Sequence, residues 1–328
     1  MQKTIVSHYE SGQTLEKYVR KVLKDAPLSF IYKLFRKKDV KVNGHWQDKK
    51  YIVNEDDEIS IYVTDAQLEE FQKKNEYHPS DYIKEWIVYE DDNVLFVNKP
   101  KGVLVQKDDG SSKALDQMVI EYLMYKKEYD PSNQLAFTPG PAHRLDRNTS
   151  GIVIFGKNQV ALQQLFSLLK EHEKIGKHYL ALVVGDVEKD GQVNAPLLKD
   201  EKKNMVKVAS LKDGGKPSIT IYHPLKRFGD CTLLDVTLVT GRTHQIRVHM
   251  AYINHPVVGD NKYGDFAFNN EFAKEYGIKN QFLHAYELHF GQFEYPLNNL
   301  SNKSFKAMMM KEEESVIVKL EQRGNNHE

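Results

Sequence analysis

A nine-residue polar segment near the middle of the chain, His143–Gly151, holds the residues best suited to chemistry. Asp146 lies between Arg144 and Arg147, and the apolar run Ile152–Phe155 follows directly. We therefore expect a polar loop that leads into a buried strand. Nearby positive charge favours the ionised form of a carboxyl group, and arginine is suited to binding phosphate. An isolated Arg-x-Asp-Arg is more often a surface pair or a turn, but this setting also suits an anionic nucleophile acting on a polyanionic substrate.

The whole segment matches all seven fixed positions of the HRLDxxTSG signature, and so resembles the RluA-type pseudouridine synthases. These enzymes isomerise uridine in RNA by breaking the N1–C1′ bond and rejoining the uracil through C5. The resemblance implies that Asp146 is the catalytic nucleophile; attack on C1′, attack on C6 and removal of the 2′ proton all remain open. The base must leave the stack to rotate, and we expect Arg144 to contact phosphate or to occupy the vacated space.

Two later segments resemble further motifs of the same family. Lys177–Gly185 resembles the second motif and places Tyr179 at the start of a strand. The resemblance implies that Tyr179 stacks on the flipped base and is a candidate for proton transfer. Gly241–His249 resembles the third motif, in which the arginine at the position of Arg247 pairs with the catalytic carboxylate.

The segments Trp86–Gly102 and Val257–Gly264 also resemble parts of the family. The first is expected to form two strands around an acidic turn and ends in Lys99-Pro100-Lys101-Gly102. Proline restricts the backbone and glycine frees it, so we expect this end to shape a turn and to have no chemical role.

Other kinds of site are less well supported by the sequence. His244, His249 and His255 lack the His-x-x-x-His spacing and an acidic companion, so we expect no metal. The glycine patterns GxGxxG and GxxxxGK[ST] are both absent, so no nucleotide or redox cofactor is expected.

A serine hydrolase is conceivable by residue type alone. Ser150, His143 and Asp146 supply the three kinds of side chain that such a site needs. The GxSxG elbow is absent, which disfavours this interpretation.

The N-terminal region is unusually basic. Residues 11–50 contain eleven lysines and arginines against four acids, whereas residues 51–92 contain thirteen acids against three lysines. Thr14 and Ser29 can cap two short helices, and Asn43-Gly44 is a strong hairpin signal. Residues 12–63 therefore resemble an S4 domain, a small RNA-binding module. The side chains expected to contact RNA are Lys33, Arg36, Lys37, Lys38 and Lys41.

Composition describes an ordinary globular chain of 328 residues with a formal net charge of zero. One cysteine, Cys231, permits no internal disulfide, and no apolar run approaches the ~20 residues that cross a bilayer. We expect a cytoplasmic protein that is a monomer and makes no contact with membranes. The expected fold is α+β: an S4-like domain and linker (1–75), then a mixed, largely antiparallel catalytic domain (76–328), with residues 64–84 as a boundary that has few buried contacts.

The sequence thus predicts an RNA pseudouridine synthase with an S4 domain, and large-subunit ribosomal RNA is the favoured substrate. Two alternatives stay open. One is a synthase that acts on transfer RNA, and the other is an idle RNA-binding assembly factor. Loss of Asp146, Tyr179 or Arg247 would have favoured the idle factor, but all three residues are present.

Overall fold

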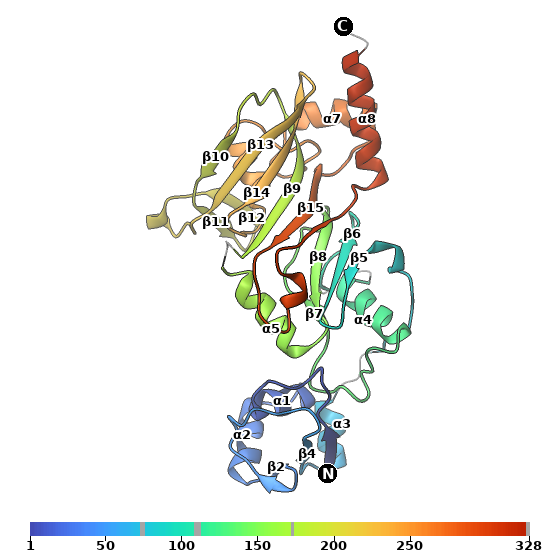
Figure 1. Ribbon diagram of the computed structural model, residues 1–328. Coiled ribbons are helices and arrows are strands. Elements are labelled where there is room, and N and C mark those ends of the chain that lie inside the picture. The colour runs from blue at the N-terminus through green and yellow to red at the C-terminus, as the bar shows by residue number, and fades with distance from the viewer. Residues whose placement is uncertain (73–75, 108–112, 172–173, 326–328) are drawn as a thin grey trace.

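A small N-terminal domain and a larger second domain make up the structure, a computed structural model that describes residues 1–72, 76–107, 113–171 and 174–325. Figure 1 shows the N-terminal domain in blue at one end, and the strands of the larger domain above it. The expected domain boundary at residue 75 lies outside the described residues. No helix of the described residues is long and apolar enough to cross a membrane.

The N-terminal domain packs helices on one antiparallel sheet of strand order β1-β4-β2-β3. Its elements are β1 (Gln2–Ile5), α1 (Leu15–Val22), α2 (Leu28–Arg36), β2 (Val40–Val42), β3 (His45–Trp46), β4 (Glu58–Ile61) and α3 (Asp65–Phe71).

Two of the three local signals in this domain are confirmed. The Lys17 N–H donates to Thr14 Oγ1, so Thr14 caps the first helix. Asn43 and Gly44 both have positive φ, at 51° and 81°, as a type I′ hairpin turn requires. The Ser29 cap is wrong, because α2 already begins at Leu28 and its N-cap is Pro27.

The segment between the domains is more structured than we expected. Thr64 caps α3 through a hydrogen bond from the Gln67 N–H. Phe71 at the end of α3 packs into the N-terminal core, and Ile83 is fully buried in the core of the larger domain. Phe71 and Ile83 are the only buried residues among those described in 64–84, so the low number of buried contacts stays a prediction for this segment, although it forms a capped helix.

The larger domain is built on a ten-stranded sheet with helices beside it. Its strands are β5 (Ile87–Glu90), β6 (Val94–Lys99), β7 (Gly140–Pro141), β8 (Ser150–Gly156), β9 (Ile175–Val184), β10 (Gly191–Asn194), β13 (Ile219–Arg227), β14 (Cys231–Leu238), β15 (Leu283–Phe290) and β16 (Ser304–Lys306). A separate hairpin consists of β11 (Leu197–Asp200) and β12 (Met205–Val208).

The helices of this domain, within the described residues, are α4 (Leu115–Tyr125), α5 (Gln159–Leu168), α6 (Gln245–Tyr252), α7 (Phe266–Tyr276) and α8 (Lys311–Asn325). Short 3₁₀ turns occur at Lys84–Trp86, Leu211–Asp213 and Asn298–Leu300.

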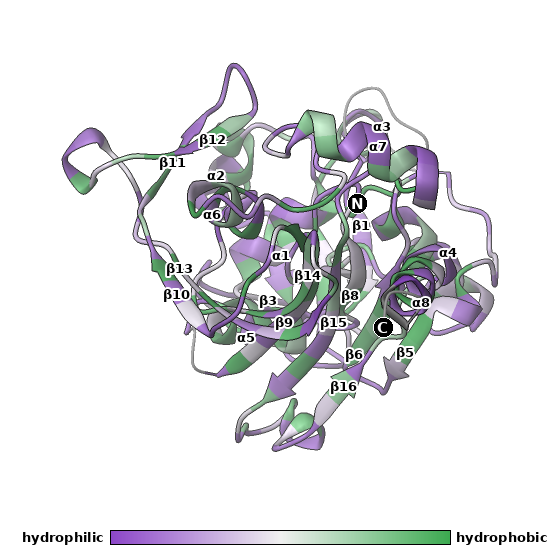
Figure 2. Cartoon of the chain, turned by 90° about the horizontal axis from the view of Figure 1, so that it is seen from above, coloured by the Kyte–Doolittle hydropathy of each residue, from purple (hydrophilic) through white to green (hydrophobic). Residues whose placement is uncertain are grey.

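The main sheet runs in the order β10-β13-β14-β9-β15-β8-β6-β5, with β16 beside β15 and β7 beside β8. All its pairs are antiparallel except β8 with β15. This confirms the expected mixed, largely antiparallel fold. Every residue of β8 is buried, which explains its apolar run, because a strand covered on both faces cannot alternate with polar residues. Figure 2 shows hydrophobic residues along the neighbouring strand β6.

Candidate active site

The segment His143–Thr149 forms a loop that ends where β8 begins. The Thr149 N–H donates to the Asp146 carbonyl at 3.0 Å, which tightens the turn around the carboxylate. Gly151 has φ of +110°, and a Cβ there would lie 2.2 Å from the Ala285 carbonyl oxygen on β15. Only glycine tolerates both conditions, so this position of the signature fixes where the loop meets the sheet.

Lys99 supports this loop through its backbone. The Lys99 ammonium group donates to the carbonyl oxygens of Pro100, Val103 and Arg147, at 2.9, 3.0 and 3.0 Å. Burial lowers the pKa of Lys99 to about 7, but three carbonyl acceptors use all three donors of the charged form. The Gly102 N–H also donates to the Arg147 carbonyl at 2.9 Å. These contacts support the architectural role expected for this segment.

Asp146 pairs with Arg247, which lies on α6. The Arg247 Nη1 donates to Asp146 Oδ2 at 2.8 Å. The same guanidinium binds Asp260 through two further hydrogen bonds, Nε to Oδ2 at 2.6 Å and Nη2 to Oδ1 at 2.9 Å. The Asp146 side chain remains 27% exposed, whereas that of Asp260 is fully buried. One carboxylate therefore anchors the arginine inside the protein, and the other keeps part of its surface accessible.

Electrostatics within this cluster favour the charged forms. Burial opposes the charge on Arg247, but its bonds to Asp260 and Asp146 raise the pKa of Arg247. Burial alone would raise the pKa of Asp260, yet the hydrogen bonds from Arg247 lower it. Backbone N–H groups of Lys262 and Tyr263 also donate to Asp260 Oδ1, at 2.8 and 3.1 Å. The hydrogen bonds to Asp260 thus fix the guanidinium in one orientation.

His244 and Tyr263 complete the surroundings of Asp146. The His244 Nε2 lies 3.8 Å from Asp146 Oδ2, and its Nδ1 lies 2.8 Å from the Tyr263 hydroxyl. That hydroxyl accepts a hydrogen bond from the Val206 N–H at 2.8 Å, so its own proton is available to Nδ1. Burial lowers the pKa of His244, so a neutral ring with its proton on Nε2 faces Asp146. The Tyr263 ring also lies against Arg247, 5.2 Å from Cζ.

Tyr179 lies in the same region but not where the sequence suggested. Strand β9 begins at Ile175, which pairs with Phe290, so Tyr179 is in mid-strand and the strand-start prediction is wrong. Its side chain is buried. Burial first, and then the negative charge of Asp146, raise the pKa of Tyr179. The hydroxyl therefore keeps its proton at neutral pH.

The two arginines that flank Asp146 in sequence are not its partners. Arg144 and Arg147 are both exposed, and neither makes an ion pair with Asp146 within the described residues. The Arg147 Nε instead donates to the Gly102 carbonyl at 3.0 Å. The expectation that flanking arginines hold the carboxylate is corrected, because that position is taken by Arg247 from a distant helix. Arg144 stays a candidate for contact with RNA.

The N-terminal cations lie away from this cluster, at the end of α2 and on β2. Lys33, Arg36, Lys37 and Lys38 are exposed. The Lys38 Nζ lies 5.3 Å from the centre of the Trp46 ring, and the Lys41 Nζ lies 5.3 Å from that of Tyr62. Two of the basic side chains therefore lie over exposed aromatic rings.

The serine-hydrolase interpretation is contradicted by the geometry. Ser150 is fully buried, and its hydroxyl bonds to Glu313 on α8 and lies 2.9 Å from His284 Nδ1. His143 does not reach it, because His143 Nε2 accepts the Ile154 N–H at 3.2 Å. Burial lowers the pKa of His143 to about 3, so this ring is neutral and supports the loop.

Four residues of this site are not among the catalytic or RNA-binding residues that the sequence predicts: Lys99, His244, Asp260 and Tyr263. All four lie in segments that resemble the family, but the resemblance gives them no chemical role. The signal available for Asp260 is an acid close to a lysine and a tyrosine in Val257–Gly264. Its pairing with Arg247 depends on tertiary contacts and does not follow from that spacing.

Comparison with known proteins identifies the family of this chain. Residues 93–252 match the family model described as RNA pseudouridylate synthase. The chain is 35% identical to the Ribosomal large subunit pseudouridine synthase C of Vibrio cholerae, over 85% of each chain. It is 36% identical to the protein of the same name from Salmonella typhimurium, over 86% of each.

A solved structure shares the fold. Human RNA Pseudouridylate Synthase Domain Containing 4 superposes with a TM-score of 0.59 at 20% identity, over 74% of this chain and 95% of the human one. The matched region of the family model contains Asp146, Tyr179 and Arg247. This chain belongs to the RNA pseudouridylate synthase family.

Proposed function

We propose that this protein converts specific uridines of large-subunit ribosomal RNA into pseudouridine, with Asp146 as the reacting carboxylate. The observation that carries the proposal is the line of three charged groups Asp146, Arg247 and Asp260, in a chain whose relatives are named large-subunit pseudouridine synthases.

The proposed chemistry needs an ionised carboxylate with one free oxygen. Arg247 binds Asp146 through Oδ2 only, which leaves Oδ1 for the substrate. Attack on C1′, attack on C6 and removal of the 2′ proton all use such an oxygen. Each route breaks the N1–C1′ bond, forms the C5–C1′ bond and releases the proton of C5.

Tyr179 and the neutral His244 would then surround a base that has left the stack. An aromatic side chain offers a face on which the flipped uracil stacks. Because Tyr179 keeps its hydroxyl proton, it enters the reaction as a proton donor or hydrogen-bond donor before it can act as a base.

The N-terminal cations are proposed to bind the same RNA. Lys33, Arg36, Lys37, Lys38 and Lys41 are the residues concerned. Phosphate contacts from lysine and arginine supply most of the affinity of such complexes and make it dependent on salt.

The test is tritium release from RNA that carries 5-labelled uridine, with large-subunit ribosomal RNA and transfer RNA compared as substrates. We expect turnover on the ribosomal RNA. The variant Asp146→Asn should abolish it while RNA affinity stays within a few-fold, because cations supply the binding. Glu201→Gln, an exposed carboxylate in the β11–β12 hairpin, is the matched control and should behave as wild type.

Three results would contradict the proposal. Turnover by a clean Asp146→Asn protein would remove the nucleophile assignment. Preference for transfer RNA would move the substrate to the alternative class. Binding without turnover by the wild-type protein would favour an idle assembly factor. Mapping pseudouridines in RNA from cells that lack the gene would identify the modified positions.

A further inference from the structure

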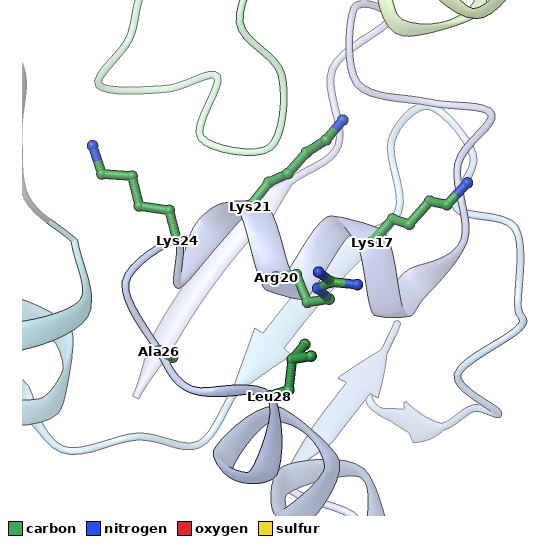
Figure 3. Close-up of a pocket in the computed structure, with 6 residues that line it drawn as sticks. All are labelled: Lys17, Arg20, Lys21, Lys24, Ala26 and Leu28. Carbon is green, nitrogen blue, oxygen red and sulfur yellow. The ribbon is translucent and has the colours of Figure 1, made fainter. Parts of the chain in front are cut away.

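Helix α1 and the residues that follow it carry four basic side chains on one side, none of which the sequence singles out as an RNA contact. These side chains are Lys17, Arg20, Lys21 and Lys24. Successive members are three, one and three residues apart, and residues three or four apart are neighbours on a helix. Figure 3 shows Lys17, Lys21 and Lys24 extending from this segment. The hollow beside them has a volume of about 390 Å³. The hollow is lined by Lys17, Arg20, Lys21, Lys24, Ala26 and Leu28.

These four cations have little internal compensation. Within the described residues, the only carboxylate within ion-pair distance of them is Glu16, 4.0 Å from Arg20. Lys21 hydrogen-bonds with the neutral side chain of Gln159. Burial and then the charge of Lys17 lower the pKa of Lys21 to about 8, against the charge of Glu10, which raises it. Like charges three or four residues apart on a helix repel one another, so an anion bound beside these side chains would relieve that repulsion.

The hollow lies between the basic end of α2 and the larger domain. Leu28, which lines it, is the first residue of α2, and Arg36 is the last. Nine helical residues span roughly 13 Å, so the hollow lies at one end of α2 and Arg36, Lys37 and Lys38 lie at the other. On its other side Lys21 reaches Gln159, the first residue of α5.

We infer that the α1 hollow binds the phosphate backbone of the RNA substrate. This inference rests on the proposed function and adds a contact at the seam between the two domains. Lysine and arginine side chains bind phosphate by charge-assisted hydrogen bonds, and the bound phosphates relieve the repulsion among the four cations. The occupant is therefore a polyanion. We assign it to the part of the RNA strand that continues from Arg36, Lys37 and Lys38 at the end of α2.

The position of the hollow also predicts a dependence on RNA length. Strand β8 begins at Ser150, four residues after Asp146, and its end at Gly156 lies three residues before Gln159. Seven strand residues span roughly 20 Å. An RNA that occupies the Asp146 site and the α1 hollow together would extend along β8 over a distance of that order, whereas a short stem-loop can occupy the Asp146 site alone.

The test uses the full chain and the variant Lys17→Gln/Arg20→Gln/Lys24→Gln, which leaves the Lys21 hydrogen bond with Gln159 intact. Binding to a long large-subunit RNA fragment is measured as a function of salt. The log–log slope should fall by about 0.7–0.9 for each phosphate that the variant no longer neutralises, and affinity should fall more for the long fragment than for a short stem-loop.

The matched control exchanges the same cations at constant charge, as Lys17→Arg/Arg20→Lys/Lys24→Arg, and should keep the wild-type slope. The midpoint of thermal unfolding of the glutamine variant should equal or exceed that of wild type, because repulsion on α1 is removed. A lower midpoint, or a wild-type affinity and slope for the long RNA, would overturn the inference. Absence of pseudouridine formation by the wild-type protein would overturn the proposed function alone, since the binding comparison still decides the α1 site.

Discussion

Arg247 lies between two carboxylates that differ in exposure, and this difference gives each a separate task. Asp260 is fully buried and receives hydrogen bonds from both the guanidinium and two backbone N–H groups. It therefore fixes the plane of Arg247. Asp146 takes the remaining nitrogen and stays partly exposed. A planar guanidinium can serve both carboxylates at once, whereas a lysine ammonium has no fork of fixed geometry.

Arg247→Lys tests this arrangement. The lysine keeps the positive charge but cannot hold both Asp260 and Asp146 in the same geometry, so turnover should fall by on the order of 10²-fold. RNA affinity should change little. Tritium release and a binding assay measure the two quantities. Arg227→Lys, which replaces an exposed arginine paired with Asp186, is the control and should be neutral. Wild-type turnover by Arg247→Lys would show that charge alone is needed.

Tyr179 can be tested with two substitutions that separate its ring from its hydroxyl. Tyr179→Phe keeps the ring, so binding should persist while turnover falls by an estimated ~10²-fold if the hydroxyl transfers a proton. Tyr179→Leu should in addition weaken capture of the base, since stacking on an aromatic ring is worth roughly 1–3 kcal/mol per base.

The pH dependence of the wild-type enzyme provides a further readout for this residue. Because burial raises the pKa of Tyr179 above its ordinary value of 10.0, loss of the phenol proton should not limit turnover between pH 7 and that value. Tyr89→Phe, at a hydroxyl bonded to Asp91, is the control. Equal binding and turnover in all variants would leave Tyr179 with a packing role.

At the scale of elements, the C-terminal helix supports the loop that carries Asp146. Glu313 on α8 is fully buried and accepts the Ser150 hydroxyl at 3.0 and 3.2 Å. Its Oε1 also lies 2.8 Å from the Lys101 Nζ. Ser150 begins β8, and Lys101 belongs to the turn that holds Arg147. The Glu313 carboxylate thus links β8 and the Lys101 turn to α8, although Glu313 lies 163 residues from Ser150 in the sequence.

Glu313→Gln should therefore weaken both stability and turnover without changing RNA affinity. The amide keeps the shape but loses the charge opposite Lys101, and a buried group without its partner costs about 1–3 kcal/mol. Thermal unfolding, turnover and binding are measured together. Glu321→Gln on the same helix, where the carboxylate forms an exposed pair with Lys226, is the matched control. If Glu313→Gln loses no more than Glu321→Gln in stability and turnover, α8 does not position the loop.

The elements that the sequence predicts well are those with strong local signals. Asn43-Gly44 sets a hairpin by its backbone preference, and the apolar run Ile152–Phe155 sets a buried strand by its composition. By contrast, β1 has only four residues that alternate in burial, and its place depends on pairing with β4. The contact of Glu313 with Ser150 likewise joins distant segments, and no local pattern encodes such a contact.

At the scale of the whole molecule, the two domains share a buried junction. Glu10 accepts the Ala136 N–H at 2.6 Å, and the Gln13 side chain donates to the Ala136 carbonyl at 3.3 Å. Ala136 and Leu135 belong in sequence to the larger domain, yet they pack with the core of the N-terminal one. Removal of residues 1–75 would expose these side chains, so the two parts are less separable than the acidic composition of residues 64–84 suggested.

Glu10→Gln tests whether this junction responds to pH. Burial raises the pKa of Glu10 above its ordinary value of 4.5, against the hydrogen bonds from Ala136 and Ser7 and the charge of Lys21, which lower it. The contribution of Glu10 to docking is therefore full below pH 4.5 and declines as pH rises through the raised value. Glutamine stays neutral and keeps an oxygen for the Ala136 N–H. The Ala136 amide should therefore exchange its hydrogen more slowly in the variant at neutral pH, and the rate should no longer follow the titration of residue 10. Hydrogen exchange at Ala136 measures the effect, with Glu16→Gln on α1 as control, and an unchanged pH profile in Glu10→Gln would assign the dependence to another group.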